Sequence, residues 1–196
     1  VYTVADALES LKLFEGHGYN KPSEIFEGIT ISFCDAGHLL GSASVHITVN
    51  ENGEERTILF SGDLGNIDRP LIRNPQNPPY ADYVVIESTY ADRLHGERPD
   101  YISQLTLILE ETFRKGGNLV IPSFAIGRTQ ELLYLFRIIK EQKLIKGFEN
   151  FIVYVDSPLA VEATKIYQDM LFDLRSDIYK NYSVSLLNSV MPKLIE

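Results

Sequence analysis

The chain has 196 residues, 44% of them apolar and 23% charged, which is typical of globular rather than disordered proteins. Its 27 acidic and 18 basic residues give a net charge of −9, which argues against binding nucleic acid or anionic membranes through bulk charge alone. The single cysteine, Cys34, excludes an internal disulfide and a cysteine-rich zinc knuckle, and it favours a reducing, cytoplasmic compartment. No apolar run reaches about eighteen residues, so no membrane span is expected.

The first half of the chain predicts one helix followed by short strands. Apolar residues recur near helical spacing over residues 4–15. Asn52-Gly53 separates two strand-like runs and predicts a tight hairpin. The segment 66–80 holds four of the nine prolines and predicts irregular structure. The predicted strands are 29–33, 44–49, 57–60 and 83–86.

From residue 99 the pattern changes to alternating helices and strands. Such an alternation is typical of a parallel sheet covered by helices. The charge changes as well, from a net −8 over residues 1–98 to −1 over 99–196. These two changes predict two domains, 1–97 and 98–196. The predicted helices are 99–115, 128–142 and one from 157 to about 174, and the predicted strands between them are 119–121 and 151–155.

Three residues at strand ends in the first half could support chemistry. His38 lies between glycines in DAGHLLGSA, where an imidazole could bind zinc or could simply cap a turn. Asp63 follows a strand in SGDLG, where its carboxylate could bridge two cations or form an Asx-turn. Glu87 begins ESTY directly after the strand 83–86, and it could orient a catalytic histidine or pair with Arg93.

Two loops that open helices in the second half could bind phosphate. In PSFAIGRTQE, the backbone amides near Gly127 and the guanidinium of Arg128 could hold an anion. The same stretch could equally be an ordinary capped loop with a solvated arginine. In DSPLA, Ser157 precedes a proline at the start of a helix, and helix capping alone would explain the pattern.

The order of these motifs is more informative than any one of them. AGHLLGSA, FSGDLG, VVIESTYADRLH, IPSFAIGRTQELL and VYVDSPLA follow one another in the chain up to about residue 170. The series closely resembles the β-CASP branch of the metallo-β-lactamase superfamily, which includes RNA 3′-end-processing endonucleases and bacterial ribonuclease J. The resemblance implies an α/β fold: part of an αββα lactamase sandwich over 1–97, then the first part of a parallel-sheet β-CASP cap over 98–196.

The resemblance also implies roles for the candidate residues. His38 resembles the third-motif zinc ligand of the family, and Asp63 resembles the carboxylate that bridges two Zn²⁺ ions. Glu87 matches the acidic residue that supports a catalytic histidine of the cap. The loops with Gly127, Arg128 and Ser157 would then meet the phosphates of single-stranded RNA, or of DNA. The activity implied for the complete site is zinc-assisted hydrolysis of phosphodiesters.

Parts of the family pattern are missing from this chain. The His-x-His-x-Asp-His zinc motif does not precede His38, and the later cap histidines do not occur before residue 196. Ala91 stands where the family usually has glycine after ESTY. We therefore expect the chain alone to bind zinc poorly, to be inactive and to self-associate through exposed sheet edges. The main alternative is a non-catalytic scaffold or nucleic-acid-binding subunit; the cap motifs argue against a hydrolase of small esters.

Overall fold

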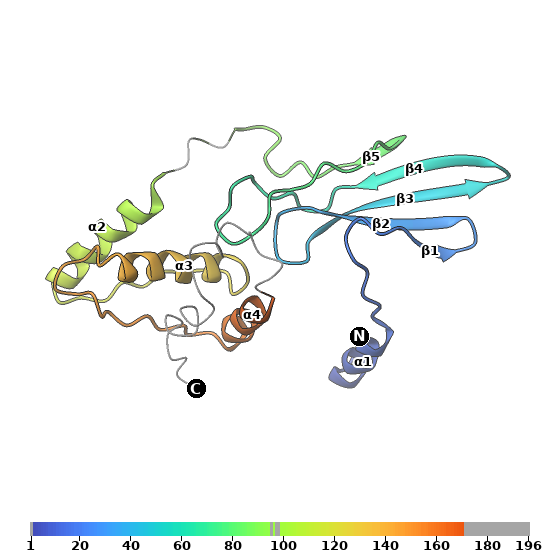
Figure 1. Cartoon of the computed structure of the whole chain (residues 1–196). Helices are drawn as coiled ribbons and strands as arrows, with labels where there is room; N and C mark the ends of the chain where they lie inside the picture. The colour runs from blue at the N-terminus through green and yellow to red at the C-terminus, as the bar shows by residue number, and fades with distance from the viewer. Residues whose placement is uncertain (1, 95, 97–98, 171–196) are drawn as a thin grey trace. The chain divides into compact units, whose positions relative to one another are not determined.

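The computed structural model describes residues 2–94, 96 and 99–170, and it confirms the α/β class (Figure 1). The chain divides into two compact units that interleave in sequence. The first unit contains the chain up to Ala36 together with Gly41–Leu64 and Pro75–Glu87. The second contains Gly37–Leu40, Gly65–Asn74 and the chain from Ser88 onwards. Two loops from the front of the sequence therefore fold with the helices of the back.

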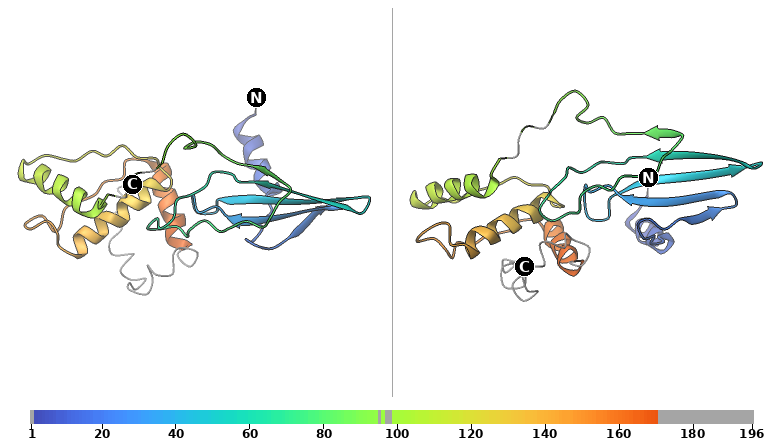
Figure 2. Two further views of the ribbon diagram at one scale, coloured as in Figure 1. Left: turned by 90° about the horizontal axis from the view of Figure 1, so that it is seen from above. Right: turned by 45° about the horizontal axis from the view of Figure 1, so that its top comes forward.

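The first unit is built on a five-stranded sheet whose strands lie in chain order, as Figure 2 shows. The first three pairs are antiparallel, and the last pair, β4 with β5, is parallel. The four predicted strands are confirmed. The first strand was not predicted, because its four residues are mostly exposed and show no inward-facing apolar pattern. The strands are β1 (Ser23–Phe26), β2 (Ile29–Asp35), β3 (Ala43–Glu51), β4 (Glu54–Phe60) and β5 (Tyr83–Val85).

The predicted hairpin at Asn52-Gly53 joins β3 to β4. Both residues have positive φ, 53° and 81°, which is the backbone of a type I′ turn. The turn sets the register so that Glu51 lies opposite Glu54. A two-residue turn of this type matches the twist of the strands, so the local sequence was sufficient to predict it.

Two polar side chains of β3 are more deeply buried than the apolar residues beside them. Ser44 and His46 are buried, whereas Val45 and Ile47 are only partly covered. The Ser44 hydroxyl donates to the carbonyl oxygen of Ser61 over 2.8 Å, and Nε2 of His46 lies 3.1 Å from the carbonyl oxygen of Tyr80. These contacts connect the sheet to the chain around it, so His46 has a structural role.

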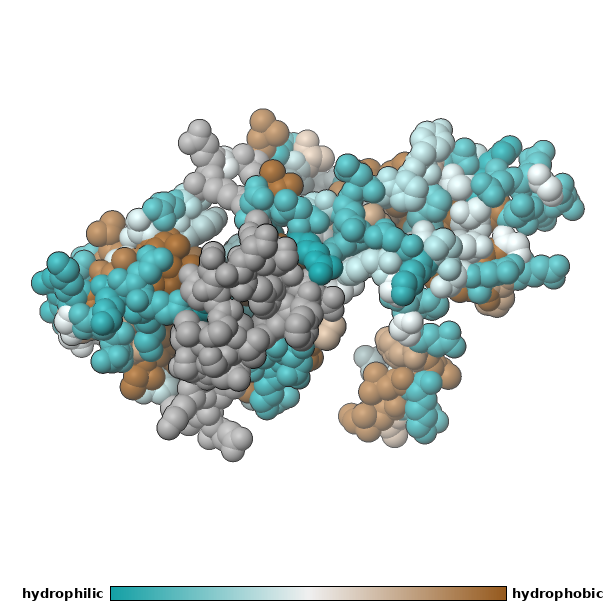
Figure 3. All heavy atoms as spheres, in the orientation of Figure 1, coloured by the Kyte–Doolittle hydropathy of each residue, from teal (hydrophilic) through white to brown (hydrophobic). Residues whose placement is uncertain are grey.

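A short helix, α1 (Val4–Ser10), begins the chain and continues into a 3₁₀ turn, Leu11–Leu13. It is capped by Thr3, whose hydroxyl accepts from the Asp6 amide. It buries none of its residues, and its apolar side chains gather as a brown patch in Figure 3. None of the helices in the described part of the chain has the length and apolar character needed to cross a bilayer.

Within the described residues, the second unit contains three helices: α2 (Tyr101–Arg114), α3 (Arg128–Glu141) and α4 (Pro158–Asp169). All three were predicted, although the expected end of the last, near 174, falls outside the described residues. Helices α2 and α3 bury a shared apolar core, because each carries apolar residues on one side. The fully buried members of that core are Leu109, Phe136, Ile139 and Ile145.

The two strands predicted in the second half, 119–121 and 151–155, are not formed. Over 151–155 the side chains do alternate, with Phe151 and Val153 packed against the helical core and Tyr154 exposed. Backbone hydrogen bonds join neither segment to a neighbouring strand within the described ranges. An alternating pattern predicts one buried face, but a strand also needs a partner for its backbone groups.

One exposed carboxylate links the chain before β5 to β4. Asp82 accepts hydrogen bonds from the amide and the hydroxyl of Thr57, at 2.7 and 2.9 Å. These bonds hold the pKa of Asp82 below its usual value, and the bond from the Thr57 amide has the larger effect. A depressed folded-state pKa stabilises the pair above the ordinary carboxyl pKa, and the effect is lost as the pH falls through the lowered value.

We therefore expect Asp82→Asn to lower the protection of the Thr57 amide against hydrogen exchange a few-fold at pH 7. The difference from the wild type should shrink as the pH falls through the lowered pKa, because the wild-type carboxylate is then protonated as well. NMR-detected exchange, corrected for intrinsic rates, measures this. Glu55→Gln, which removes an exposed carboxylate on the same strand, is the control and should change little. A difference that stays constant with pH would contradict the role given to Asp82.

Candidate functional site

Asp63 and Glu87 are brought to the same end of the parallel pair β4 and β5. The Ser61 amide donates to the carbonyl oxygen of Val85 over 2.9 Å, and the Glu87 amide donates to the Ser61 hydroxyl over 3.0 Å. The Glu87 carboxylate in turn accepts from the amide of Leu64. The turn after β4 is thus latched to the residue that ends β5. Parallel strands end at one sheet edge, which is where α/β sheets commonly place ligands.

The Asp63 side chain is exposed in this turn. Its carboxylate makes no hydrogen bond to any other described residue, so the Asx-turn that was the alternative interpretation is not formed. The preceding Gly62 has a φ of 58°, and a Cβ on it would lie only 3.0 Å from the carbonyl oxygen of Ala43. The glycine lets the chain turn tightly here and leaves the Asp63 carboxylate available to a cation or to solvent.

His38 is half-buried and lies in the second unit, in the loop Gly37–Leu40. Its carbonyl oxygen accepts a 2.6 Å hydrogen bond from Nη1 of Arg69. A Cβ on Gly65 would collide with the carbonyl oxygen of Gly37, so the backbones of the two loops touch directly. The backbone of the His38 loop is therefore fixed by its neighbours within the second unit.

The loop before α3 is organised by Gln130. The side-chain oxygen of Gln130 accepts from the Gly127 amide at 2.7 Å, as in the second half of a capping box. Its side-chain nitrogen donates to the carbonyl oxygen of Ala125 and to the hydroxyl of Thr164 on α4, at 3.1 and 3.0 Å. Gly127 has a φ of 80°, which a side chain would strain. The Gln130 side chain therefore connects two backbone groups of this loop to α4.

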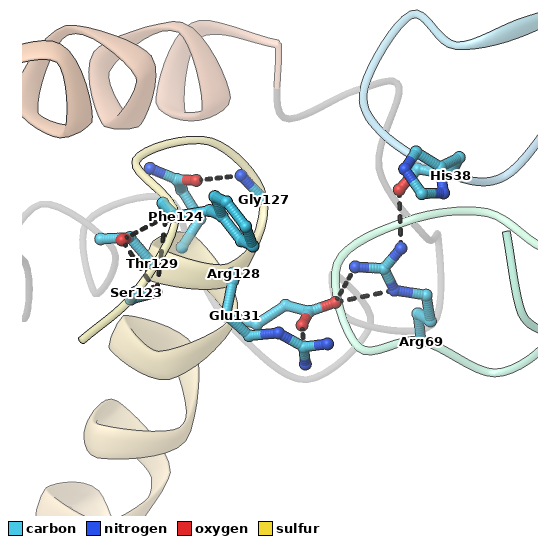
Figure 4. A network of polar contacts seen from close by, with 9 residues as sticks. His38, Arg69, Ser123, Phe124, Gly127, Arg128, Thr129 and Glu131 are labelled. Atoms are coloured by element: carbon cyan, nitrogen blue, oxygen red, sulfur yellow. Dashed lines mark hydrogen bonds and ion pairs between the residues drawn. The ribbon is translucent and has the colours of Figure 1, made fainter. Parts of the chain in front are cut away.

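The arginine of this loop is not simply solvated. Figure 4 shows Arg128 pairing with Glu131, with Nη1 2.7 Å from the carboxylate. Its side chain is still 59% exposed. The amides of Arg128 and Thr129 donate to carbonyl oxygens of the loop itself, those of Ile126 and Phe124. Because these two amides already donate within the loop, the exposed guanidinium of Arg128 is the group better placed to bind a phosphate.

Ser157 caps α4, because its hydroxyl accepts from the Ala160 amide over 3.2 Å and Pro158 occupies the first turn. Capping accounts for this motif locally, and Ser157 belongs to the second unit with Gly127 and Arg128.

Farther along α4, burial raises the pKa of the Tyr167 phenol, which therefore stays neutral at physiological pH.

In the part of the chain that the structure describes, the candidate donors do not make a complete metal site. Asp63 belongs to the first unit and His38 to the second. Across residues 2–94, 96 and 99–170, no group of three or more histidine, cysteine, aspartate or glutamate side chains could hold a metal ion. A catalytic zinc site needs at least three protein ligands, so the two candidates are too few on their own.

Two charged residues of the network in Figure 4 were missed at the level of sequence. Arg69 lies in the proline-rich segment that predicted only irregular structure, and Glu131 was part of the PSFAIGRTQE motif without a role of its own. The available signal was in the GRTQE motif, where glutamine at the third helical position is typical of a capping box. A pair 62 residues apart in sequence leaves no local pattern.

Gln130 provides a direct test of this arrangement. Its side chain is buried, with 2% exposure, so Gln130→Met would keep the shape, leave the Gly127 amide without its side-chain partner and remove the bonds to Ala125 and Thr164. We expect a loss of about 2–4 kcal/mol in the stability of α3 and α4, measured by native-state hydrogen exchange. Gln142→Met, at the exposed end of α3, is the control and should change stability by less than about 0.5 kcal/mol. Equal effects of the two substitutions would contradict the role assigned to Gln130.

Comparisons with known proteins agree with the motif order. A Beta-Casp domain model matches residues 129–193. Ribonuclease TTHA0252 of Thermus thermophilus is 36% identical over 158 residues, which are 78% of this chain and 35% of that protein. An RNase J-like protein of Methanocaldococcus jannaschii is 32% identical over 174 residues, 87% of this chain and 39% of that protein. The endoribonuclease YSH1 of Kluyveromyces lactis is 29% identical over 197 residues, all of this chain and 25% of that protein.

The chain thus spans between a quarter and two fifths of the length of these relatives. The matches to the first two relatives extend over most of the chain, beyond the residues of the domain model. Together with the ordered motifs and the mixed α/β structure, they identify the family: the chain belongs to the β-CASP branch of the metallo-β-lactamase superfamily.

Proposed function

We propose that the complete protein containing this chain is a metal-dependent ribonuclease that hydrolyses phosphodiester bonds in RNA. The observation that supports this most strongly is the latch between Ser61, Leu64 and Glu87, which holds two acidic side chains at one edge of the sheet. An exposed aspartate beside a fixed glutamate suits a hydrolytic centre better than a purely structural turn. Three relatives whose names describe ribonucleases share this stretch of sequence.

In this proposal His38 and Asp63 contribute two of the ligands for a pair of zinc ions, and the remaining ligands lie outside this chain. Zinc would supply an activated water and charge stabilisation at the phosphate. Neutral imidazole and carboxylate oxygen are both suitable zinc ligands. The exposed Asp63 carboxylate is available for this role, whereas that of Glu87 is already bound by the Leu64 amide.

The proposed role of Glu87 is to orient a histidine that protonates the leaving oxygen. One oxygen of its carboxylate accepts from the Leu64 amide, which restricts the orientation of the side chain. A carboxylate that holds an imidazole in one orientation is a common device of acid–base catalysis. Arg93, the other partner considered, lies with its guanidinium 4.7 Å from the ring centre of Tyr90.

For the substrate, we propose single-stranded RNA bound by the second unit, with Arg128 meeting a phosphate and Gly127 and Ser157 shaping the loops beside it. The guanidinium is exposed and is oriented by Glu131, so it is already ordered before an anion arrives. The near-neutral charge of residues 99–196 repels RNA less than the acidic first half would.

His38→Ala and Asp63→Asn in the complete protein should each lower RNA cleavage at least about a hundredfold, because a lost ligand weakens a metal contribution of several kcal/mol. Cleavage of 5′-labelled single-stranded RNA and metal content by mass spectrometry measure the two effects together. His17→Ala and Asp169→Asn, both exposed, are matched controls and should change neither. Unchanged metal content in both ligand variants would overturn the metal assignment. A wild type that binds RNA without cleaving it would favour a non-catalytic scaffold.

Glu87→Gln separates the acid–base role from metal binding. Glutamine can still accept from the Leu64 amide, so the latch should remain. We expect kcat to fall by about a hundredfold or more, with metal content unchanged, because the carboxylate no longer holds an imidazolium. Glu51→Gln, an exposed glutamate at the end of β3, is the control. An unaltered kcat would exclude the role proposed for Glu87.

A further inference from the structure

One arginine connects the backbone of His38 to the first turn of α3. Nη1 of Arg69 donates to the carbonyl oxygen of His38 over 2.6 Å. Nε and Nη2 of the same guanidinium lie 2.9 and 2.7 Å from one carboxylate oxygen of Glu131. Figure 4 shows this guanidinium between the histidine loop and the helix. In the sequence, Arg69 is 31 positions from His38 and 62 positions from Glu131, and all three residues belong to the second unit.

The helix end of this connection is strongly fixed. The Glu131 side chain is only 5% exposed, and a buried carboxylate is costly unless it is paired. It has two guanidinium partners, Arg69 and Arg128, and it lies in the first turn of a 14-residue helix, where the dipole favours negative charge. Glu131 therefore has little freedom to move away from Arg69 while α3 stays folded.

Two steric contacts reinforce the same connection. The Gly65 backbone, four residues before Arg69, touches the carbonyl oxygen of Gly37, next to His38. A Cβ on Gly127 would lie 2.6 Å from a methyl group of Leu39, so the residue after His38 packs against the bare backbone at the start of α3. The loop is thus held on both sides of the histidine.

We propose that Arg69 and Glu131 are positioning residues, which set the orientation of His38 by tying its backbone to the first turn of α3. The catalytic meaning of this coupling rests on the proposed function, in which His38 belongs to the hydrolytic centre. The physical coupling does not depend on it. A shift of α3, for example when Arg128 meets an anion, is transmitted through the shared Glu131 carboxylate to Arg69 and so to the His38 loop.

A second ion pair on α3 shows what a merely structural pair would look like. Arg137 is 4% exposed, and its Nε lies 3.0 Å from Glu141 one turn later. This pair is as deeply buried as Arg69 with Glu131, but both of its members lie on the same helix. Arg137→Gln is therefore the same chemical change as Arg69→Gln, made at an arginine that is even less exposed, and it leaves the connection to the histidine loop intact.

The test uses the complete protein with Arg69→Gln, Glu131→Gln, Arg69→Lys and the control Arg137→Gln. Hydrogen exchange of the amides in residues 37–41 should become about tenfold faster or more in the first two variants, because a charge-assisted hydrogen bond is lost. Arg69→Lys keeps the charge but cannot bind both partners at once, so it should rescue the protection only in part. Exchange in β3 reports whether each variant is folded.

RNA cleavage supplies the functional reading. Arg69→Gln should lower kcat by about tenfold to a hundredfold with KM nearly unchanged, as misplacement of a reacting group does. Unchanged exchange in residues 37–41, or equal acceleration in Arg137→Gln, would overturn the proposal. Faster exchange with unchanged kcat would overturn the positioning role while leaving the ribonuclease assignment intact. If the wild type cleaves no RNA, the proposed function fails, and the exchange measurements alone decide whether α3 orients His38.

Discussion

A carboxylate cannot remain buried in a protein without partners, and the second unit is organised around the way this requirement is met at Glu131. The side chain lies in the first turn of α3 and forms ion pairs with Arg69 from an irregular loop and with Arg128 from its own helix. Arg69 also binds the backbone of His38, so the residue that neutralises the Glu131 charge also holds the loop Gly37–Leu40, which is distant in sequence. The irregular segment 66–80 is therefore ordered for a reason that its prolines do not reveal.

In the first unit, the constraint is that two parallel strands must end in a closed turn while the Asp63 carboxylate stays exposed. Ser61 binds the backbone of β5 and of Glu87, and Glu87 binds the amide of Leu64. The hydrogen bonds needed to close the turn come from Ser61 and Glu87. Asp63 is thereby spared from the turn and keeps its carboxylate exposed.

Features set by neighbouring residues could be predicted from sequence. Asn52-Gly53 was sufficient for a hairpin, and the helix beginning at Pro158 followed from its serine cap. The strands at 119–121 and 151–155 were predicted from apolar runs, but strand formation also depends on a partner that the pattern does not specify. The site divides in the same way. His38, Asp63 and Glu87 stood out because each follows a strand within a glycine-bounded or apolar motif. The pair of Arg69 and Glu131 instead joins a loop to the first turn of α3, and only the fold brings these together.

The direct approach of Gly65 to Gly37 has a mechanical consequence. Side chains that separate two segments act as a soft layer, because rotamers can adjust to absorb a displacement. Here the backbone of one loop rests on the carbonyl oxygen of the other with no side chain between them. Because closely packed atoms are hard to compress, we expect a movement of residue 65 towards residue 37 to displace residue 37 as well, so that the two loops move together.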